Sequence, residues 1–269
     1  MHDGVNAREG EAMDDDSDGG LPASIEAAWG LRERPGKGPR PGLSLRRIVA
    51  AAVKVADSEG LAAVSMSRVA AELGASTMSL YRYVAAKDEL LALMVDAAGG
   101  PPPAARAADE GWREGLSRWA RVELDFHRRH PWVVRVPISG PPVAPNQVAW
   151  LERGLDCLRD TGLAEGEKLS VILLLTGFVR NYATLEADLS EAARASGSDP
   201  QAAMPNYGRL LAKLTDADRF PALHAVIAAG VFDGPEDPQD LEDLNAEFAF
   251  GLDRVLDGID ALVRARARG

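Results

Sequence analysis

Residues 72–91 of the chain have the sequence ELGASTMSLYRYVAAKDELL, and this stretch decides the fold. Gly74 suits the tight turn that ends one short helix, and Ser76 suits the N-cap of the next. We therefore predict one short helix at 67–73 and a second at 77–84. Two short helices joined by a glycine-containing turn are typical of a helix-turn-helix, whose second helix enters the major groove of duplex DNA.

The spacing of apolar residues predicts helices on both sides of this motif. A helix from Ser44 to Gly60 precedes it, and a helix that opens at Lys87 and is broken by the glycine and proline run at 99–103 follows it. One further helical turn, capped by Ser24, is expected nearer the N-terminus. Later helices are expected at about 109–130, 145–160, 166–192 and 240–264, with shorter pieces near 132 and 205–230. No stretch has a convincing strand pattern, so the predicted fold class is all-α.

Composition and helix spacing together predict the domain organisation. An N-terminal three-helix helix-turn-helix DNA-binding domain is expected to precede a C-terminal helical core for dimerisation; the role of this core in ligand binding is implied only by the family resemblance of residues 47–98 and 248–263. The predicted boundaries are a disordered arm, first acidic and then basic, at 1–42, the DNA-binding domain at 43–98, a linker at 99–108, and the ligand-binding and dimerisation domain at 109–269.

The net charge of −11 argues against nucleic acid as a partner only until its distribution is considered. Residues 1–31 hold one Lys or Arg against eight Asp or Glu, whereas residues 32–87 hold ten against four. A compact basic segment on an acidic body lets one end approach phosphates while the rest repels them. The charge pattern therefore favours DNA binding by the first helices.

Several other classes of protein find little support in the sequence. The single cysteine, Cys157, excludes an internal disulfide, and no paired Cys and His spacing suggests zinc. His127 and His130 lack a third ligand, and the arginines between them would repel a cation, so we expect no metal and no cofactor. No apolar run is long enough to span a membrane and no signal peptide is evident, so we expect a cytoplasmic protein.

Residues 47–98 resemble the DNA-binding domain of the TetR family through the glycine turn, the YRYV segment and the following KDELL. Residues 248–263, FAFGLDRVLDGIDALV, are similar to the last helix of the tetracycline-repressor branch. The resemblance implies a homodimeric transcriptional regulator, a repressor released from a palindromic operator by a small-molecule effector. An activator with the same fold is an alternative, and an enzyme with an attached helix-turn-helix is a weaker one because no catalytic motif is evident.

The resemblance also implies particular DNA contacts. It places Thr77, Met78 and Ser79 at base edges and Tyr81, Tyr83 and Lys87 on phosphates, roles that their side-chain chemistry suits. Both tyrosines are also at a spacing typical of packing residues. Two hydroxyl residues at the start of the preceding helix are further candidates for phosphate contacts, Ser65 and Ser67. Four basic residues of the arm either enter a minor groove or belong to a solvated linker: Arg32, Arg34, Lys37 and Arg40.

The sequence indicates the residues of the expected ligand pocket less specifically than those of the DNA-binding motif. Candidate pocket residues combine large apolar side chains with a few polar ones, although the same residues also suit a core or a dimer interface. They are Trp112, Trp119, Phe126, His127, Trp150, Phe178, Asn181 and Tyr182. Thr176, Arg180 and Asn181 interrupt an apolar helix, so some of them are expected to have specific partners. Apolar residues recur at spacings of three and four in the helices expected at 166–192 and 240–264, and each row forms an apolar seam. The two seams predict a dimer interface of Val171, Leu175, Phe178, Leu185, Phe248, Leu252, Val255 and Ile259.

Overall fold

The computed structural model describes residues 22–31, 43–107, 109–138, 140–197, 200–233 and 245–268. All regular elements in these ranges are helical, which confirms the all-α prediction. Their bounds are α1 Ala23–Ala28, α2 Leu45–Glu59, η1 Leu61–Ala63, α3 Met66–Leu73, α4 Thr77–Tyr81, α5 Lys87–Gly99, α6 Trp112–Arg129, η2 Pro131–Arg135, α7 Pro145–Cys157, α8 Glu165–Ser196, α9 Pro200–Leu214, α10 Pro221–Ala228 and α11 Ala246–Arg266.

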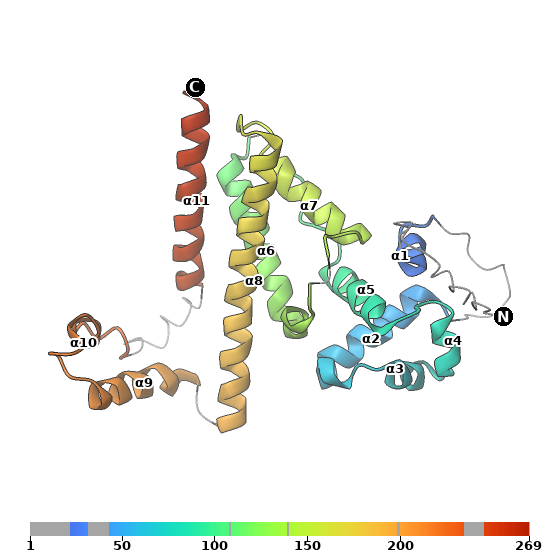
Figure 1. The fold of residues 1–269 in the computed structure, drawn as a ribbon, viewed down its shortest axis with the longest axis horizontal. Helices are drawn as coiled ribbons and strands as arrows, with labels where there is room; N and C mark the ends of the chain where they lie inside the picture. Colours follow the sequence, from blue (N-terminus) through green and yellow to red (C-terminus); the bar gives the residue numbers. More distant parts are fainter. Residues whose placement is uncertain are drawn as a thin grey trace, which may run out of the picture.

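Helices α2 to α5 form a head that lies to one side of a body made of α6, α7, α8 and α11 (Figure 1). The head closes around side chains from each of its helices, including Ile48, Val69, Leu80 and Leu90, all fully buried. Helix α1 packs against α2 and adds Ile25 to the same core. Apolar side chains from every helix of the head therefore meet in one cluster.

Serine caps set where α2, α3 and α4 begin. The hydroxyl oxygens of Ser44, Ser65 and Ser76 accept hydrogen bonds from the amides of Arg47, Arg68 and Ser79, three residues further along in each case. The bonds to Arg47 and Arg68 satisfy amides of the first helical turn, and the amide of Ser79 also bonds to the carbonyl of Ser76. The cap predicted at Ser76 is confirmed, and Ser44 and Ser65 cap α2 and α3 in the same way.

Two local predictions were wrong. Helix α4 ends at Tyr81 instead of Val84, because the amides of Tyr83 and Val84 both bond to the carbonyl of Leu80 and close the chain into a turn. Ser24 does not cap α1, since Pro22 occupies the N-cap position and Ser24 lies buried inside the helix.

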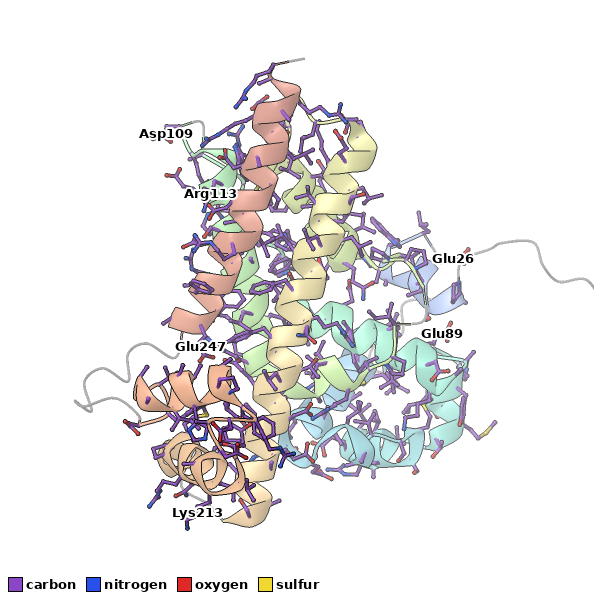
Figure 2. The ribbon with its side chains drawn as sticks, turned by 60° about the vertical axis from the view of Figure 1, so that its left-hand side comes forward. Glu26, Glu89, Asp109, Arg113, Lys213 and Glu247 are labelled. Carbon is purple, nitrogen blue, oxygen red and sulfur yellow. The ribbon has the colours of Figure 1, made fainter. Side chains whose placement is uncertain are left out.

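The body is held by apolar packing between its long helices. Helix α8 contacts α6, α7 and α11, and its buried side chains include Leu175 and Val179. Helix α11 adds Phe248, Leu252 and Leu256 to the same cluster. Arg113 of α6, labelled in Figure 2 beside α11, donates to Asp257 at 2.8 Å. Arg266 at the end of α11 pairs with Glu167 at the start of α8, so these two helices run antiparallel.

The remaining helices, α9 and α10, pack against each other at the far end of α8, near Lys213 in Figure 2. Tyr207 and Phe232 meet there edge to face, with ring centroids 5.7 Å apart. No helix in the described ranges combines the length and apolar character needed to cross a lipid bilayer. The predicted arm at 1–42 lies outside the described residues except for 22–31.

The head joins the body through both apolar and polar contacts. Phe126 of α6, together with Trp132 and Val136 of the segment that follows it, belongs to the head's core cluster. On the other side of the junction, Asp96 of α5 accepts from the amide of Gln147 at 2.9 Å and so caps the first turn of α7. The head and the body therefore share packed side chains and a helix cap at this junction.

Candidate DNA-binding surface and sensor core

An ion-pair network holds α3 against α2. Arg68 donates to Glu59 at 2.5 Å and to Glu72 at 2.9 Å, and Lys54 of α2 donates to Glu72 at 2.7 Å. Hydrogen bonds from Lys54 and Arg68 lower the pKa of Glu72, and the two carboxylates raise the pKa of Arg68. Because Arg68 and Lys54 are engaged with carboxylates, we assign them to positioning the motif and not to contacting DNA.

Helix α4 is anchored on one side and exposed on the other. Leu80 is fully buried, whereas Met78 is 75% exposed and Tyr81 46% exposed. Thr77 is half-buried, and the hydroxyl of Ser79 lies 2.7 Å from that of its cap, Ser76. The predicted base-contacting residues thus lie on one short helix, with Met78 the most accessible of them.

The predicted phosphate contacts fall into different environments. Tyr83 is half-buried, and its hydroxyl donates to the carbonyl of Leu43 at 2.9 Å, which ties the end of α4 to the start of α2. Ser65 is engaged as the cap of α3, with its hydroxyl 3.1 Å from that of Ser67. Ser67 and Lys87 are exposed. Lys87, Ser67 and Tyr81 are therefore the accessible members of the set.

Arg82 is an exposed cation that the predicted set of DNA contacts omitted. It caps the C-terminus of α4, between the two tyrosines. A basic residue at the end of a predicted recognition helix was a usable signal, because guanidinium groups bind phosphate well. The four predicted arm residues lie outside the described residues: Arg32, Arg34, Lys37 and Arg40.

Five of the eight predicted pocket residues belong to the apolar core cluster of the body. Trp119 and Trp150 meet edge to face at 5.9 Å, and the Trp119 indole donates to the Trp150 carbonyl; Trp112 packs at the edge of the same cluster. In the same cluster Phe178 stacks on Phe248 of α11, and Tyr182 meets the ring of Phe248 edge to face.

The other three pocket candidates lie elsewhere. Phe126 belongs to the head's core, and His127 is 5% exposed in the body. Asn181 is exposed, because it falls between Val179 and Ala183, which α8 turns toward the core. The expectation of a specific partner holds for Arg180, whose guanidinium donates to the carbonyls of Val134 and Val136 at 3.0 and 2.9 Å.

A polar cluster lies inside the body where α6 faces α8. Glu123 Oε2 and His127 Nδ1 are buried and have no hydrogen-bond partner. Burial raises the pKa of Glu123 to about 8 even though the charge of Arg180 opposes the shift. Burial, together with that same charge, lowers the pKa of His127 to about 4. Glu123 was missed at the level of sequence, because an acidic residue on an amphipathic helix ordinarily lies in solvent.

Most residues predicted for the dimer interface belong to the core of the single subunit. Five of them are at most 5% exposed, which leaves almost no surface for a partner: Val171, Leu175, Phe248, Leu252 and Ile259. Phe178 and Val255 are half-buried, and only Leu185 is largely exposed. The two seams pack against each other and against α6, so this part of the interface prediction differs from the structure.

An apolar surface remains on α8 and α11. A groove of about 480 Å³ lies between them, lined in part by Leu174, Val255 and Leu262. Leu173 and Phe250 beside it are 73% and 66% exposed. Gly177 and Gly258 are also exposed, with open space where a side chain would be. This surface allows close approach of further helices.

The chain combines a helix-turn-helix head with a helical body that contains buried polar groups. This combination is typical of DNA-binding regulators. Comparison with known proteins identifies the family. The model for the tetracyclin repressor-like C-terminal domain matches residues 104–263, and the model for bacterial regulatory proteins of the tetR family matches residues 48–94. The chain belongs to the TetR family of bacterial regulatory proteins, as its sequence had suggested.

Individual relatives agree with this assignment. The chain is 39% identical over 249 residues to the HTH-type transcriptional repressor DrrR1 of Streptomyces coeruleorubidus, covering 92% of this chain and 88% of that protein. Apo ActR from Streptomyces coelicolor has a TM-score of 0.67 at 26% identity, covering 82% of this chain and 98% of ActR. The complex of ActR with actinorhodin also gives a TM-score of 0.67, at 27% identity, covering 82% of this chain and 97% of that one.

Proposed function

We propose that this chain is a cytoplasmic, dimeric repressor that binds an inverted-repeat operator and leaves it when a small molecule enters the body. The proposal assigns DNA binding to residues 43–98, and ligand binding and dimerisation to 109–269. The observation that carries it is the anchoring of α4 by Leu80, which leaves Met78 and Tyr81 exposed on the other side. Relatives support the rest, since DrrR1 is named a repressor and ActR was solved with actinorhodin.

In this proposal Thr77, Met78 and Ser79 meet base edges, while Tyr81, Arg82 and Lys87 meet phosphates. Hydroxyls bond to several base edges, and Met78 offers an apolar contact to a thymine methyl. The phosphate contacts fix position and carry little sequence information. Tyr83 has a positioning role, because its hydroxyl is already bonded to Leu43.

A second copy of the chain occupies the α8 and α11 surface in this proposal. An inverted repeat needs two heads related by a two-fold axis, and the exposed Leu173, Leu174 and Phe250 supply an apolar patch for such contact. Ligand and DNA each prefer a different spacing of the two heads. Bound ligand therefore lowers the affinity for DNA by the same factor by which bound DNA lowers the affinity for ligand.

Selection of duplex sites from a random library tests the proposal. We expect an inverted repeat, bound more tightly than scrambled DNA, with an affinity that falls steeply with salt. Tyr81→Ala and Lys87→Ala should weaken binding to both DNAs, whereas Lys213→Ala removes an equivalent charge from α9 and should leave binding unchanged. If no sequence is enriched and Lys213→Ala acts like Lys87→Ala, the proposal fails.

A further inference from the structure

Three polar side chains converge between α6 and α8 without satisfying one another. Glu123 and His127 lie four residues apart on α6, and each has a buried atom with no hydrogen-bond partner. Arg180 approaches from α8 closely enough for its charge to act on both, yet the described part of the chain contains no hydrogen bond or ion pair between it and either residue. A further polar group placed among them would satisfy all three.

The charge of the cluster favours an anion. In the described residues no carboxylate forms an ion pair with Arg180, whose guanidinium is held only by the carbonyls of Val134 and Val136. Burial keeps Glu123 protonated and His127 uncharged near neutral pH, so the net charge of the cluster is positive. A protonated carboxyl, an imidazole and a guanidinium all donate hydrogen bonds, and an acidic group accepts them.

The neighbouring side chains are apolar. Trp119 lies one turn before Glu123 on the same face of α6 and is 3% exposed. Pockets for small molecules combine such apolar walls with a few buried polar groups that fix orientation. We propose that Glu123, His127 and Arg180 form a subsite for the acidic group of an aromatic effector, a carboxylic acid or an acidic phenol. This inference rests on the proposed function and names the chemical class of its effector.

The position of Arg180 gives the subsite a route to the head. Of the two residues whose carbonyls Arg180 binds, Val134 lies in η2 and Val136 directly follows it, and η2 also carries Trp132 into the head's core. An anion bound to Arg180 competes with these carbonyls for its guanidinium hydrogens. Occupancy of the subsite therefore loosens or shifts η2, the element that joins the sensor to α2.

Calorimetry with paired probes tests the subsite on the full-length chain. Aromatic carboxylates of one to three rings, such as 2-naphthoate, are compared with their neutral amides, such as 2-naphthamide. We expect at least one carboxylate to bind at least tenfold more tightly than its amide. Equal binding of acid and amide at every ring size, or no binding of either, overturns the proposal.

Variants test whether the preference for acid over amide depends on the proposed subsite. Arg180→Met should abolish it, whereas Arg194→Met removes a charge from the exposed end of the same helix and should preserve it. Because Arg180→Met also loses two backbone contacts, Glu123→Leu provides a second variant. It should lower acid affinity at least fivefold, leave amide affinity unchanged and raise the melting temperature, since it removes a carboxyl with one buried oxygen that has no hydrogen-bond partner. An acid preference that survives both variants overturns the assignment.

Operator binding, measured on the same preparation without probe, separates the two proposals. An operator that is bound while no acid preference exists leaves the regulator proposal standing and removes only the subsite. An acid preference without any selected operator removes the regulator proposal, and the subsite stands as a binding site of unassigned purpose.

Discussion

The carboxylate of Asp57 on α2 accepts a hydrogen bond of 2.6 Å from the indole nitrogen of Trp132 in η2. Nδ1 of His130 lies 2.8 Å from the same oxygen. One side chain of the head thus contacts two residues that directly follow α6. Since α2 supports α3 through the Lys54 and Glu72 pair, a shift at the end of α6 reaches the DNA-binding motif through few contacts.

This contact should be measurable as a coupling energy. We expect Asp57→Ala and Trp132→Phe each to lower the free energy of unfolding, with a coupling of about 1 kcal/mol in a double-mutant cycle, because the bond joins a carboxylate acceptor to a buried donor. Urea denaturation measures the four proteins. A coupling near zero would show that the contact contributes nothing. Operator affinity without effector should stay within twofold, because neither residue lies on α4.

The two tyrosines of the motif should respond differently to substitution. Tyr83→Phe removes the bond to the Leu43 carbonyl and should cost about 1 kcal/mol of stability. Tyr81→Phe removes a hydroxyl from a side chain that is 46% exposed and should weaken DNA binding with no loss of stability. Thermal unfolding and fluorescence anisotropy on the selected operator separate the two effects. A loss of stability in Tyr81→Phe, with none in Tyr83→Phe, would contradict these two roles.

The same motif shows what could be predicted from sequence. The caps at Ser44, Ser65 and Ser76 depend on an amide three residues away, so local sequence was sufficient to find them. The role of Tyr83 depends on Leu43, which lies 40 residues earlier in the chain. No local pattern contains that contact, and both interpretations of Tyr83 were therefore open before the fold was known.

Glu123 predicts a pH dependence of stability. Its pKa is about 8 in the folded chain against 4.5 for an ordinary Glu, so the folded state holds the proton more tightly than the unfolded state does. The contribution of this carboxyl to the free energy of unfolding is therefore fully present below pH 4.5 and is lost as pH rises through 8. From pH 6.5 to 9 this carboxyl should cost about 2 kcal/mol, a loss that Glu123→Gln removes.

His127 acts in the opposite direction and in a different range. Its pKa is lowered from 6.5 to about 4, so its contribution to stability is present above pH 6.5 and is lost as pH falls through 4. Denaturation of wild type and Glu123→Gln above pH 6.5 thus isolates the carboxyl. Parallel curves for the two proteins in that range would contradict the buried, protonated state of Glu123.

The proposed dimer surface predicts a monomeric variant. Leu174→Glu places a charge in the groove between α8 and α11, on a side chain that is 54% exposed in the subunit. We expect a folded monomer by light scattering at micromolar concentration, and a loss of operator affinity because two half-sites need two heads. Ile138→Glu, at a residue 74% exposed outside that surface, should remain dimeric.

The interface also shows where sequence reasoning stopped. Spacings of three and four placed Leu175 and Leu252 correctly on apolar seams, and both are fully buried. Periodicity identifies a buried face but not the element that covers it, and in this fold α8 and α11 cover each other. The surface left for a partner lies off the seams, at residues such as Leu173 and Phe250.

Packing at the junction limits how heads can be exchanged between relatives. The two family models leave residues 95–103 between them, which suggests a convenient place to splice a chimera. Yet the head's core also contains Phe126, Trp132, Val136 and Ala144, all beyond that point. A head cut at the linker would lose these apolar partners, so a functional hybrid must transfer the end of α6 and η2 with it. The unit that must be transferred to change DNA specificity is therefore larger than residues 48–94, which the model of the DNA-binding domain matches.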